Sequence, residues 1–216
     1  LVDIGGGTTD IAIFNSGSIV FTGVIPIAGD QVTSDIAQAL RTPTPQAEDI
    51  KQKHGCAVTE FTKDDQTVEV LAVGGRPPRE LSRSALADII QPRYSELFDL
   101  IKAEITRNGF EDKISAGIVF TGGTSKMEGV VELAESIFQT SVRLGIPSKF
   151  QGMETILQNP IYSTSIGLIE HGFKQLNNEM LSEQSQGIFS KLLRIIKSEY
   201  WLKKLIQLEC LLLGFY

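Results

Sequence analysis

A strand–glycine–strand stretch opens the chain and constrains what the rest can fold into. Residues 1–13 place an apolar run before three consecutive glycines, a pair of threonines and a second apolar run. This order predicts a β-hairpin whose turn has no side chains to keep a ligand away. Glycine reaches backbone angles that other residues avoid, so successive N–H groups can converge on one anion. A tight hairpin that needs glycine for its geometry alone is the competing interpretation.

The side chains around this turn favour a phosphate. Threonine hydroxyls add donors, and a carboxylate at the end of the first strand can hold a hydrated cation beside the anion. A nucleotide phosphate with Mg²⁺ is the simplest ligand that combines the two. The predicted nucleotide-binding residues of this turn are Asp3, Gly5, Gly6, Gly7, Thr8 and Thr9, with Asp3 as the metal ligand.

The composition is that of an ordinary globular protein. The chain has 216 residues, of which 42% are hydrophobic and 21% charged. Its net charge of −6 argues against a general nucleic-acid binder. Residues 188–216 carry five basic and two acidic side chains, a net +3, which leaves −9 for the rest. The chain begins inside an apolar strand without methionine, so we expect a fragment that lacks an N-terminal part.

Neither cysteine nor histidine spacing indicates a catalytic or metal site. Cys56 and Cys210 form no disulfide framework and suit a reducing compartment. His54 and His171 lack the spacing of a catalytic triad and are expected to be structural or exposed.

Apolar periodicity predicts an open α/β sheet, in which ligands bind at the strand ends. Further strands are expected at 18–27, near 68–72, at 116–120 and at 142–144. Helices are expected at 30–40, from Thr44 to Gly55, at 79–106 with Pro92 as a kink or break, at 127–138 and at 161–173. Residues 174–187 lack a repeating apolar pattern and are interpreted as a linker, followed by a separate helix over 188–206.

A second glycine turn follows the strand at 116–120. Gly122 and Gly123 let a flat group or a sugar lie against the backbone, and the helix that begins near Met127 favours negative charge at its N-terminus. An ordinary strand-to-helix connection is the alternative. Two glycine turns at strand ends are more informative than either one alone.

A charged pair on the second predicted helix is a third candidate. Glu48 and Lys51 are three residues apart and share a helix face, so they can hold a base or a ribose. From spacing alone, a surface salt bridge is the better interpretation.

The predicted terminal helix has an apolar stripe flanked by cations and followed by tryptophan. This pattern is typical of a helix that lies in the membrane plane, although a helix docked on its own domain or on another subunit is the alternative. Its apolar runs are too short to span a bilayer. The residues predicted to contact the membrane are Phe189, Leu192, Leu193, Ile196, Lys197, Tyr200, Trp201, Lys203 and Lys204.

The order of these segments resembles the actin and Hsp70 ATPase superfamily. "DIGGGTTD" is similar to its second phosphate motif and "GIVFTGGTSKMEG" to its adenosine motif. More narrowly, the chain resembles FtsA, the actin-like family of bacterial cell division. "VIPIAGDQVTSDIA", "RTPTPQAEDIKQKHGCA", "PRELSRSALADIIQPRYSEL" and "PIYSTSIGL" all match its segments, and the similarity covers residues 1 to about 206.

The resemblance implies the C-terminal lobe of an actin-like, ribonuclease H-like α/β fold. Residues 1–29 and 116–174 would form the core subdomain (IIA), and 30–115 an inserted smaller α+β subdomain (IIB). A linker at 175–187 would lead to an amphipathic membrane-targeting helix at 188–206. Half of the nucleotide cleft, including the first phosphate loop, would lie outside the chain. The apolar end at 208–216 extends past the usual close of the family.

The resemblance also implies the site and the function. Asp3 and the first glycine turn would hold the β- and γ-phosphates of ATP with Mg²⁺, Glu48 and Lys51 would face adenine and ribose, and Gly122, Gly123 and Met127 would form the other wall. The protein would be a division adaptor that assembles into actin-like filaments and tethers the FtsZ ring to the cytoplasmic face of the inner membrane, at the septum. The FtsZ C-terminal tail would bind the 30–115 subdomain, where the candidate contacts are Arg83, Arg93 and Glu96.

The resemblance implies an ATP-binding protein with at most weak ATPase activity. One competitor is a small-metabolite kinase of the same fold, which would need a substrate-side carboxylate base and has no use for a basic amphipathic tail. A scaffold of the MreB or pilus-assembly type is the other. The "TPTPQAEDIKQKHGC" run and the terminal helix favour FtsA over both.

Overall fold

A computed structural model describes residues 1–63, 65–71, 77–147 and 158–183, with side chains up to Leu176. The chain divides into two units, of which the first spans Leu1–Ile166 and contains every described strand.

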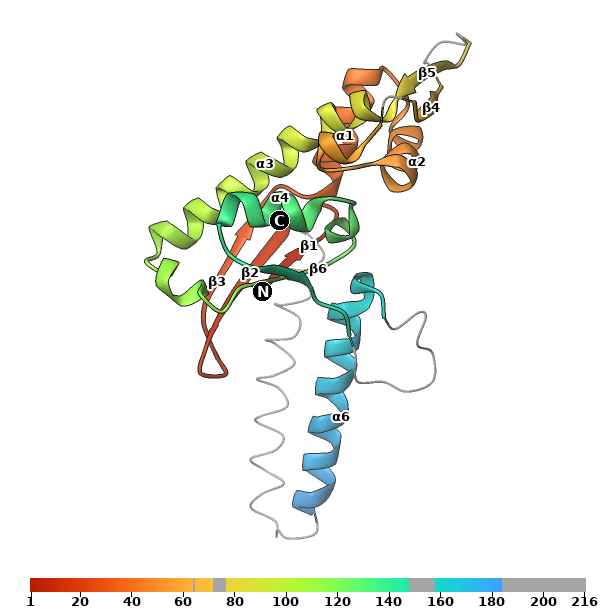
Figure 1. Cartoon of the computed structure of the whole chain (residues 1–216). Coiled ribbons are helices and arrows are strands. Elements are labelled where there is room, and N and C mark those ends of the chain that lie inside the picture. The colour runs from red at the N-terminus through yellow and green to blue at the C-terminus, as the bar shows by residue number, and fades with distance from the viewer. Residues whose placement is uncertain (64, 72–76, 148–157, 184–216) are drawn as a thin grey trace. The chain divides into compact units, whose positions relative to one another are not determined.

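A five-stranded mixed sheet forms the centre of the first unit (Figure 1). Its strand order is β3-β2-β1-β6-β7. The first three strands are antiparallel neighbours, whereas β6 runs parallel to β1 and β7 runs parallel to β6. The strands are β1 (Val2–Ile4), β2 (Thr9–Asn15), β3 (Ser18–Ile25), β6 (Ile118–Thr121) and β7 (Val142–Leu144).

Parallel pairing of β1 with β6 places their carboxyl ends at the same edge of the sheet. In the register, Val2 lies opposite Phe120 and Asp3 lies opposite Thr121. Both glycine turns of the sequence therefore leave the sheet side by side, although more than a hundred residues separate them along the chain.

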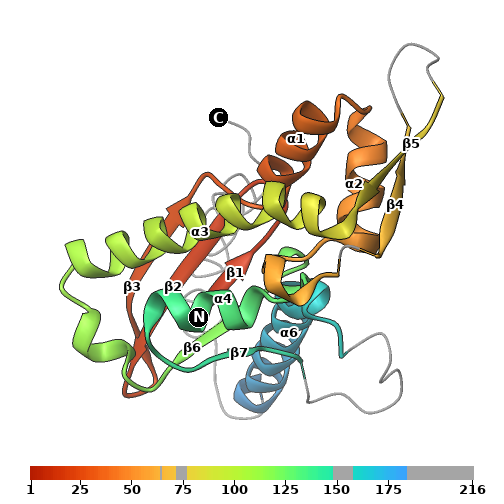
Figure 2. The same ribbon diagram turned by 45° about the horizontal axis from the view of Figure 1, so that its top comes forward.

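Two helices, α3 (Arg83–Arg107) and α4 (Val130–Phe138), cover one face of this sheet (Figures 1 and 2). Aromatic side chains fill the space between helix and sheet. The ring of Phe98 on α3 stacks on Phe120 of β6, with 5.4 Å between the ring centroids, and lies 5.8 Å from Phe138 of α4. All three side chains are buried, so the sheet and the two helices share one core.

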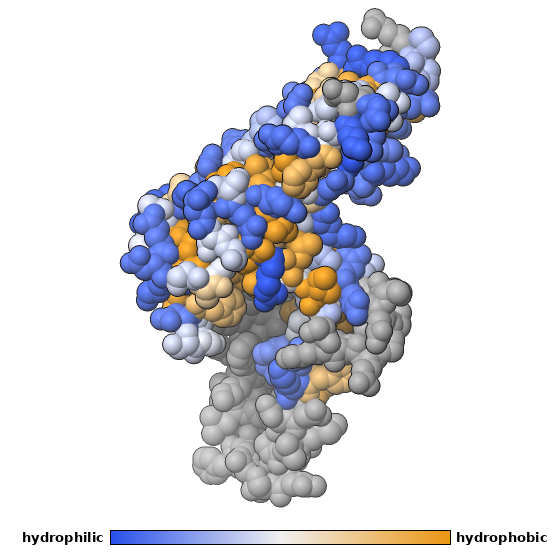
Figure 3. Space-filling view, viewed as in Figure 1, coloured by the Kyte–Doolittle hydropathy of each residue, from blue (hydrophilic) through white to orange (hydrophobic). Residues whose placement is uncertain are grey.

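The N-terminal end of α3 packs with α1 (Gly29–Leu40), α2 (Thr44–His54) and a two-stranded sheet. That sheet pairs β4 (Thr67–Val70) with β5 (Arg79–Ser82) in antiparallel register. Val32, Ile36 and Leu40 of α1 are buried at helical spacing, as the sequence predicts. The surface at this end is mostly hydrophilic (Figure 3).

The structure corrects the expected start of the long helix. Residues 79–82 form strand β5 instead of the first helical turn, and α3 begins at Arg83 because Ser82 caps it by accepting a hydrogen bond from the Ala85 N–H. Pro92 neither splits α3 nor ends it, and the helix continues through it from Arg83 to Arg107.

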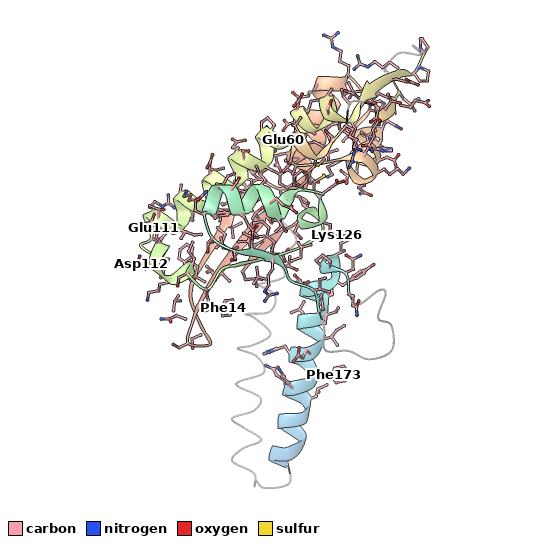
Figure 4. The ribbon with its side chains drawn as sticks, viewed as in Figure 1. Phe14, Glu60, Glu111, Asp112, Lys126 and Phe173 are labelled. Atoms are coloured by element: carbon pink, nitrogen blue, oxygen red, sulfur yellow. The ribbon has the colours of Figure 1, made fainter. Side chains whose placement is uncertain are left out.

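The last described helix, α6 (Ser163–Glu183), is longer than expected. It continues ten residues beyond 173, over positions interpreted as a linker, and follows a short 3₁₀ turn at Pro160–Tyr162. Leu168, Ile169 and Phe173 on this helix are exposed. Figure 4 labels Phe173 on α6 and Phe14, which is also exposed, on β2. None of the described helices is long and apolar enough to cross a membrane.

Candidate functional site

The first glycine turn links β1 to β2 and is accessible at its tip. The Gly5 N–H closes the turn by donating to the Thr8 carbonyl at 3.0 Å, while Gly6, Gly7 and Thr8 are exposed. None of these three glycines has a positive φ, so the turn does not need glycine for left-handed backbone angles. Exposed glycines bring no side chains of their own, so an anion can approach the backbone N–H groups of this turn.

The first turn of helix α1 holds this glycine turn through backbone hydrogen bonds. The N–H groups of Gly29 and Asp30 donate to the carbonyls of Gly5 and Gly6 at 3.2 and 2.7 Å. A Cβ atom on Gly6 would lie 3.4 Å from the Asp30 carboxylate, so glycine leaves room for that side chain. The first turn of α1 thereby fixes two carbonyls of the first glycine turn.

The two threonines of the turn have different surroundings. Thr8 is exposed, and its hydroxyl donates to Asp10 Oδ2 at 3.3 Å. Thr9 is fully buried, and its hydroxyl donates to the Ile27 carbonyl at 2.7 Å. Thr8 therefore presents polar atoms at the predicted phosphate position, whereas Thr9 ties β2 to the segment that precedes α1.

Asp3 lies at the carboxyl end of β1, half-buried, between two neighbours. It pairs across the sheet with Asp10 on one side and with Thr121 on the other. Its Oδ2 accepts a hydrogen bond from the Thr164 hydroxyl at 2.9 Å. This bond orients the carboxylate, which remains the side chain best placed to hold a cation next to the glycine turn.

Asp10 is affected by the same surroundings. Burial raises the pKa of its carboxyl, the hydrogen bond from Thr8 acts in the opposite direction, and the charge of Asp3 raises the pKa further. Two carboxylates directly opposite each other on antiparallel strands repel when both are ionised. A bound cation would relieve that repulsion.

The second glycine turn needs its first glycine for two reasons. Gly122 has a φ of +87°, in the left-handed region, and a Cβ atom there would clash with Asp3 Oδ1 and the Ile4 carbonyl. The glycine therefore lets the end of β6 approach the carboxylate of Asp3. Gly123 is exposed, and so is Lys126 on the 3₁₀ turn that follows (Figure 4).

Met127, the predicted wall of the adenosine pocket, packs on the end of α2. A Cβ atom on Gly55 would clash with its Sδ and Cε atoms. This contact places Met127 and the glycine that ends α2 side by side, so the second glycine turn lies next to the helix that carries Glu48 and Lys51.

Lys51 is buried, and three acceptors surround its ammonium group. Its Nζ lies 3.0 Å from the Gly29 carbonyl, 2.8 Å from Thr33 Oγ1 and 2.7 Å from Glu48 Oε2. A lysine ammonium has three N–H donors, and all three are engaged. Lys51 therefore ties α2 to the first turn of α1 and has no donor left over for a ribose.

Glu48 is half-exposed and keeps an accessible edge. Burial disfavours its charged form, but hydrogen bonds from Lys51, Thr33 and Gln52 outweigh that effect and lower its pKa. The ion pair of Glu48 with Lys51 that the spacing predicts is present, but it is not a surface salt bridge because Lys51 is buried. Of the two side chains it is Glu48 that can reach a ligand.

The side chains predicted to contact a partner form ion pairs within the chain. Arg93 on α3 forms a two-pronged ion pair with Asp35 of α1, at 2.6 and 2.9 Å, and a third bond to Glu96 at 2.6 Å. The hydrogen bonds that Arg93 donates to the Asp35 carboxylate raise the pKa of its guanidinium. Arg83 donates to the His54 carbonyl and pairs with Glu128, which joins α3 to the loop after the second glycine turn.

Sequence reasoning missed the groups that link these parts. Thr124 donates from its hydroxyl to the Gly5 carbonyl at 2.7 Å, and its own carbonyl accepts from the Tyr94 hydroxyl at 2.9 Å. Thr33 and Thr164 were missed too, because no local spacing marks a contact made by distant segments. The predicted membrane residues, 189–204, lie outside the described part of the chain.

Comparison with known proteins decides the family. The family model described as "Cell division protein FtsA" matches residues 1–167, which is more than half of the chain. The chain belongs to the FtsA family. The Pseudomonas aeruginosa cell division protein FtsA is 57% identical over 190 residues, which are 88% of this chain and 46% of that protein.

Solved structures share the actin-like α/β fold. MreB 5 of Spiroplasma citri bound to AMPPNP superposes with a TM-score of 0.62 at 24% identity, over 82% of this chain and 54% of that one. The MamK double helical filament has a TM-score of 0.50 at 19% identity, over 76% of this chain and 53% of that one. The chain spans about half the length of the curated relatives it matches.

Proposed function

We propose that this chain supplies one side of an ATP–Mg²⁺ site in a cell-division adaptor of the FtsA family. The observation that carries the proposal is the meeting of two glycine turns beside Asp3, at the carboxyl ends of neighbouring strands. Ligands of open α/β sheets bind at this edge. The AMPPNP bound to the MreB neighbour is an ATP analogue, which supports the choice of nucleotide.

Each part of the site has a role in this proposal. The exposed N–H groups of Gly6 and Gly7 bind phosphate oxygens, and Glu48 accepts from a ribose hydroxyl. Gly122, Gly123 and Met127 form the surface on which the adenosine lies. Lys51 joins α2 to the first turn of α1 through its three contacts and does not contact the nucleotide.

The residues present fit a magnesium ion. Mg²⁺ in nucleotide sites is held by one or two carboxylates, phosphate oxygens and waters, so it needs no dedicated cage of protein ligands. Among the described residues no group of three or more His, Cys, Asp or Glu side chains is close enough to hold a metal. Asp3, oriented by Thr164, would be the protein's contribution, and the ion would neutralise phosphate charge.

Family membership supports a role in cell division. In the proposed role the protein self-associates, as the filament formed by MamK supports, and links the FtsZ tail to the inner membrane at the septum. The FtsZ-binding surface centres on Arg93 and Glu96, because Arg83 is largely enclosed by its contacts to His54 and Glu128. ATP acts as a bound ligand with weak hydrolysis at most, and the terminal helix provides the membrane contact.

The experiment that tests the ATP site uses a chimera in which this chain replaces the stretch of the Pseudomonas relative that it matches. Asp3→Ala should weaken Mg²⁺-dependent ATP binding about tenfold or more, since a hydrogen bond or contact to a charged group is worth about 1.5–3 kcal/mol. Isothermal titration with and without Mg²⁺ measures the effect.

Asp112→Ala is the matched control, because Asp112 is exposed on the 3₁₀ turn before β6, at the opposite end of that strand from the second glycine turn. Equal affinity of the Asp3 and Asp112 variants would remove Asp3 from the site. Absence of ATP binding by the unmodified chimera would contradict the proposed function as a whole.

A further inference from the structure

One backbone carbonyl connects the first glycine turn, residues 5–8, to two other segments. The Gly5 carbonyl oxygen accepts from the Gly29 N–H at 3.2 Å and from the Thr124 hydroxyl at 2.7 Å. A carbonyl oxygen has two lone pairs, so its acceptor capacity is filled. The two donors come from α1 and from the second glycine turn, and they hold the first residue of the phosphate turn between them.

The threonine that makes this contact is itself held. The Thr124 carbonyl accepts from the hydroxyl of Tyr94, which is fully buried on α3 and 2.9 Å away. Burial raises the pKa of this phenol strongly, so it stays a hydrogen-bond donor. Gly29 also has to be a glycine here, because a Cβ atom at that position would clash with Thr124 Oγ1.

We propose that Thr124 is the positioning residue of the nucleotide site, and that Tyr94 sets its position. In this proposal, which rests on the proposed ATP site, the chain of bonds from Tyr94 through Thr124 to Gly5 fixes the two glycine turns relative to each other. The N–H groups of Gly6 and Gly7 then keep the direction that phosphate binding needs, without Thr124 touching the nucleotide.

The position of Tyr94 gives this link a second consequence. Tyr94 follows Arg93, the centre of the proposed partner surface, and α3 continues from it across the sheet. A change in the phosphate turn therefore reaches α3 through two hydrogen bonds. The same α3 segment is tied to α1 through the Arg93–Asp35 pair, so α1 and Thr124 act on one stretch of helix from two sides.

The test compares Thr124→Val, which removes the hydroxyl but keeps the shape, with Thr124→Ser, which keeps the hydroxyl. In the chimera, ATP affinity should fall about 3- to 10-fold for Thr124→Val, the range expected for one neutral hydrogen bond, and stay within about twofold for Thr124→Ser. Thr106→Val is the control, since the Thr106 hydroxyl donates to nearby Glu111 at the far end of α3.

A double-mutant cycle separates positioning from mere loss of stability. If Tyr94 acts through Thr124, Tyr94→Phe should weaken ATP binding when Thr124 is present and have little further effect in Thr124→Val. Strictly additive losses, or equal losses in Thr124→Val and Thr106→Val, would overturn the proposal.

A measurement without nucleotide keeps the two proposals distinguishable. In the 216-residue chain, hydrogen exchange of the Gly29 amide and of residues 4–8 should accelerate about 3- to 10-fold in Thr124→Val and not in Thr124→Ser or Thr106→Val. Unchanged exchange overturns the positioning role even if ATP binds. Faster exchange in the 216-residue chain, together with a chimera that does not bind ATP, supports the link and refutes the proposed ATP site.

Discussion

Replacing Lys51 by methionine tests whether the buried ammonium holds the α1–α2 junction together. Methionine matches the length of the lysine stem but has no donor. The change leaves the Gly29 carbonyl, the Thr33 hydroxyl and the Glu48 carboxylate without the group that now lies 2.7–3.0 Å from each of them. Only the side chain of Glu48, 37% exposed, can turn to water for compensation.

The magnitude follows from these surroundings. Removing one partner of a fully buried ion pair costs about 3–5 kcal/mol. The cost here should be lower because Glu48 is partly hydrated, and because the protein no longer has to bury a charge. We expect Lys51→Met to reduce the free energy of unfolding by about 2–4 kcal/mol, measured by urea denaturation at pH 7.

The same helix provides the control. Lys53 pairs with Asp49 at 2.7 Å, but its side chain is 62% exposed, so Lys53→Met should cost no more than about 1 kcal/mol. Equal losses for the two variants would refute the argument that burial and saturated donors make Lys51 structural.

The pH dependence gives a second check. The pKa of Glu48 is lowered in the folded state, so its ionised form stabilises the fold above the unfolded-state pKa, and that contribution is lost as the pH falls through the folded-state pKa. The difference between wild type and Lys51→Met should therefore narrow in acid. A difference that is constant from pH 7 to the acid limit would contradict the ion-pair explanation.

Two further predictions concern the site. Gly122→Ala should lower the free energy of unfolding, measured in urea, by about 3 kcal/mol or more, because a Cβ atom at this positive φ would clash with Asp3 and Ile4. Gly109→Ala is the control: Gly109 also has a positive φ but lies in open space, so the change should cost about 1 kcal/mol. Equal losses would argue against the close approach of β6 to Asp3. Asp10→Asn should raise the melting temperature at neutral pH, because the raised pKa of Asp10 means that its ionised form opposes folding. The gain in stability is present above the folded-state pKa of Asp10 and vanishes below the unfolded-state value of 3.8. A variant that melts at a lower temperature than wild type at pH 7 would contradict the prediction.

Local sequence patterns were sufficient to predict most strands of the sheet and the two glycine turns. The apolar runs and glycines at 1–13 and 116–123 predict strands that end in accessible turns, and parallel pairing of β1 with β6 then brings the turns together. The i, i+3 spacing of Glu48 and Lys51 predicts their contact correctly. These features depend on residues that are close in sequence or on a general property of parallel sheets.

The parts that could not be predicted depend on long-range packing. Residues 79–82 pair with β4 and so form a strand, although their sequence continues smoothly into the helix. The saturation of Lys51 depends on Gly29 and Thr33 of another helix, and the contact of Thr124 with Gly5 spans 119 positions. A single hydroxyl or carbonyl carries each of these contacts, and neither leaves a periodic signal in the sequence.

Photolabelling with an ATP analogue that carries an azide on adenine tests most directly whether the two turns form a nucleotide site. In the chimera with Mg²⁺, we expect label in the tryptic peptides 114–126 and 127–143, which hold Gly122, Gly123 and Met127, or in 42–51, which holds Glu48. Excess unlabelled ATP should remove the label. Label that ATP displaces from other peptides of this chain, with these three unmodified, would contradict the account.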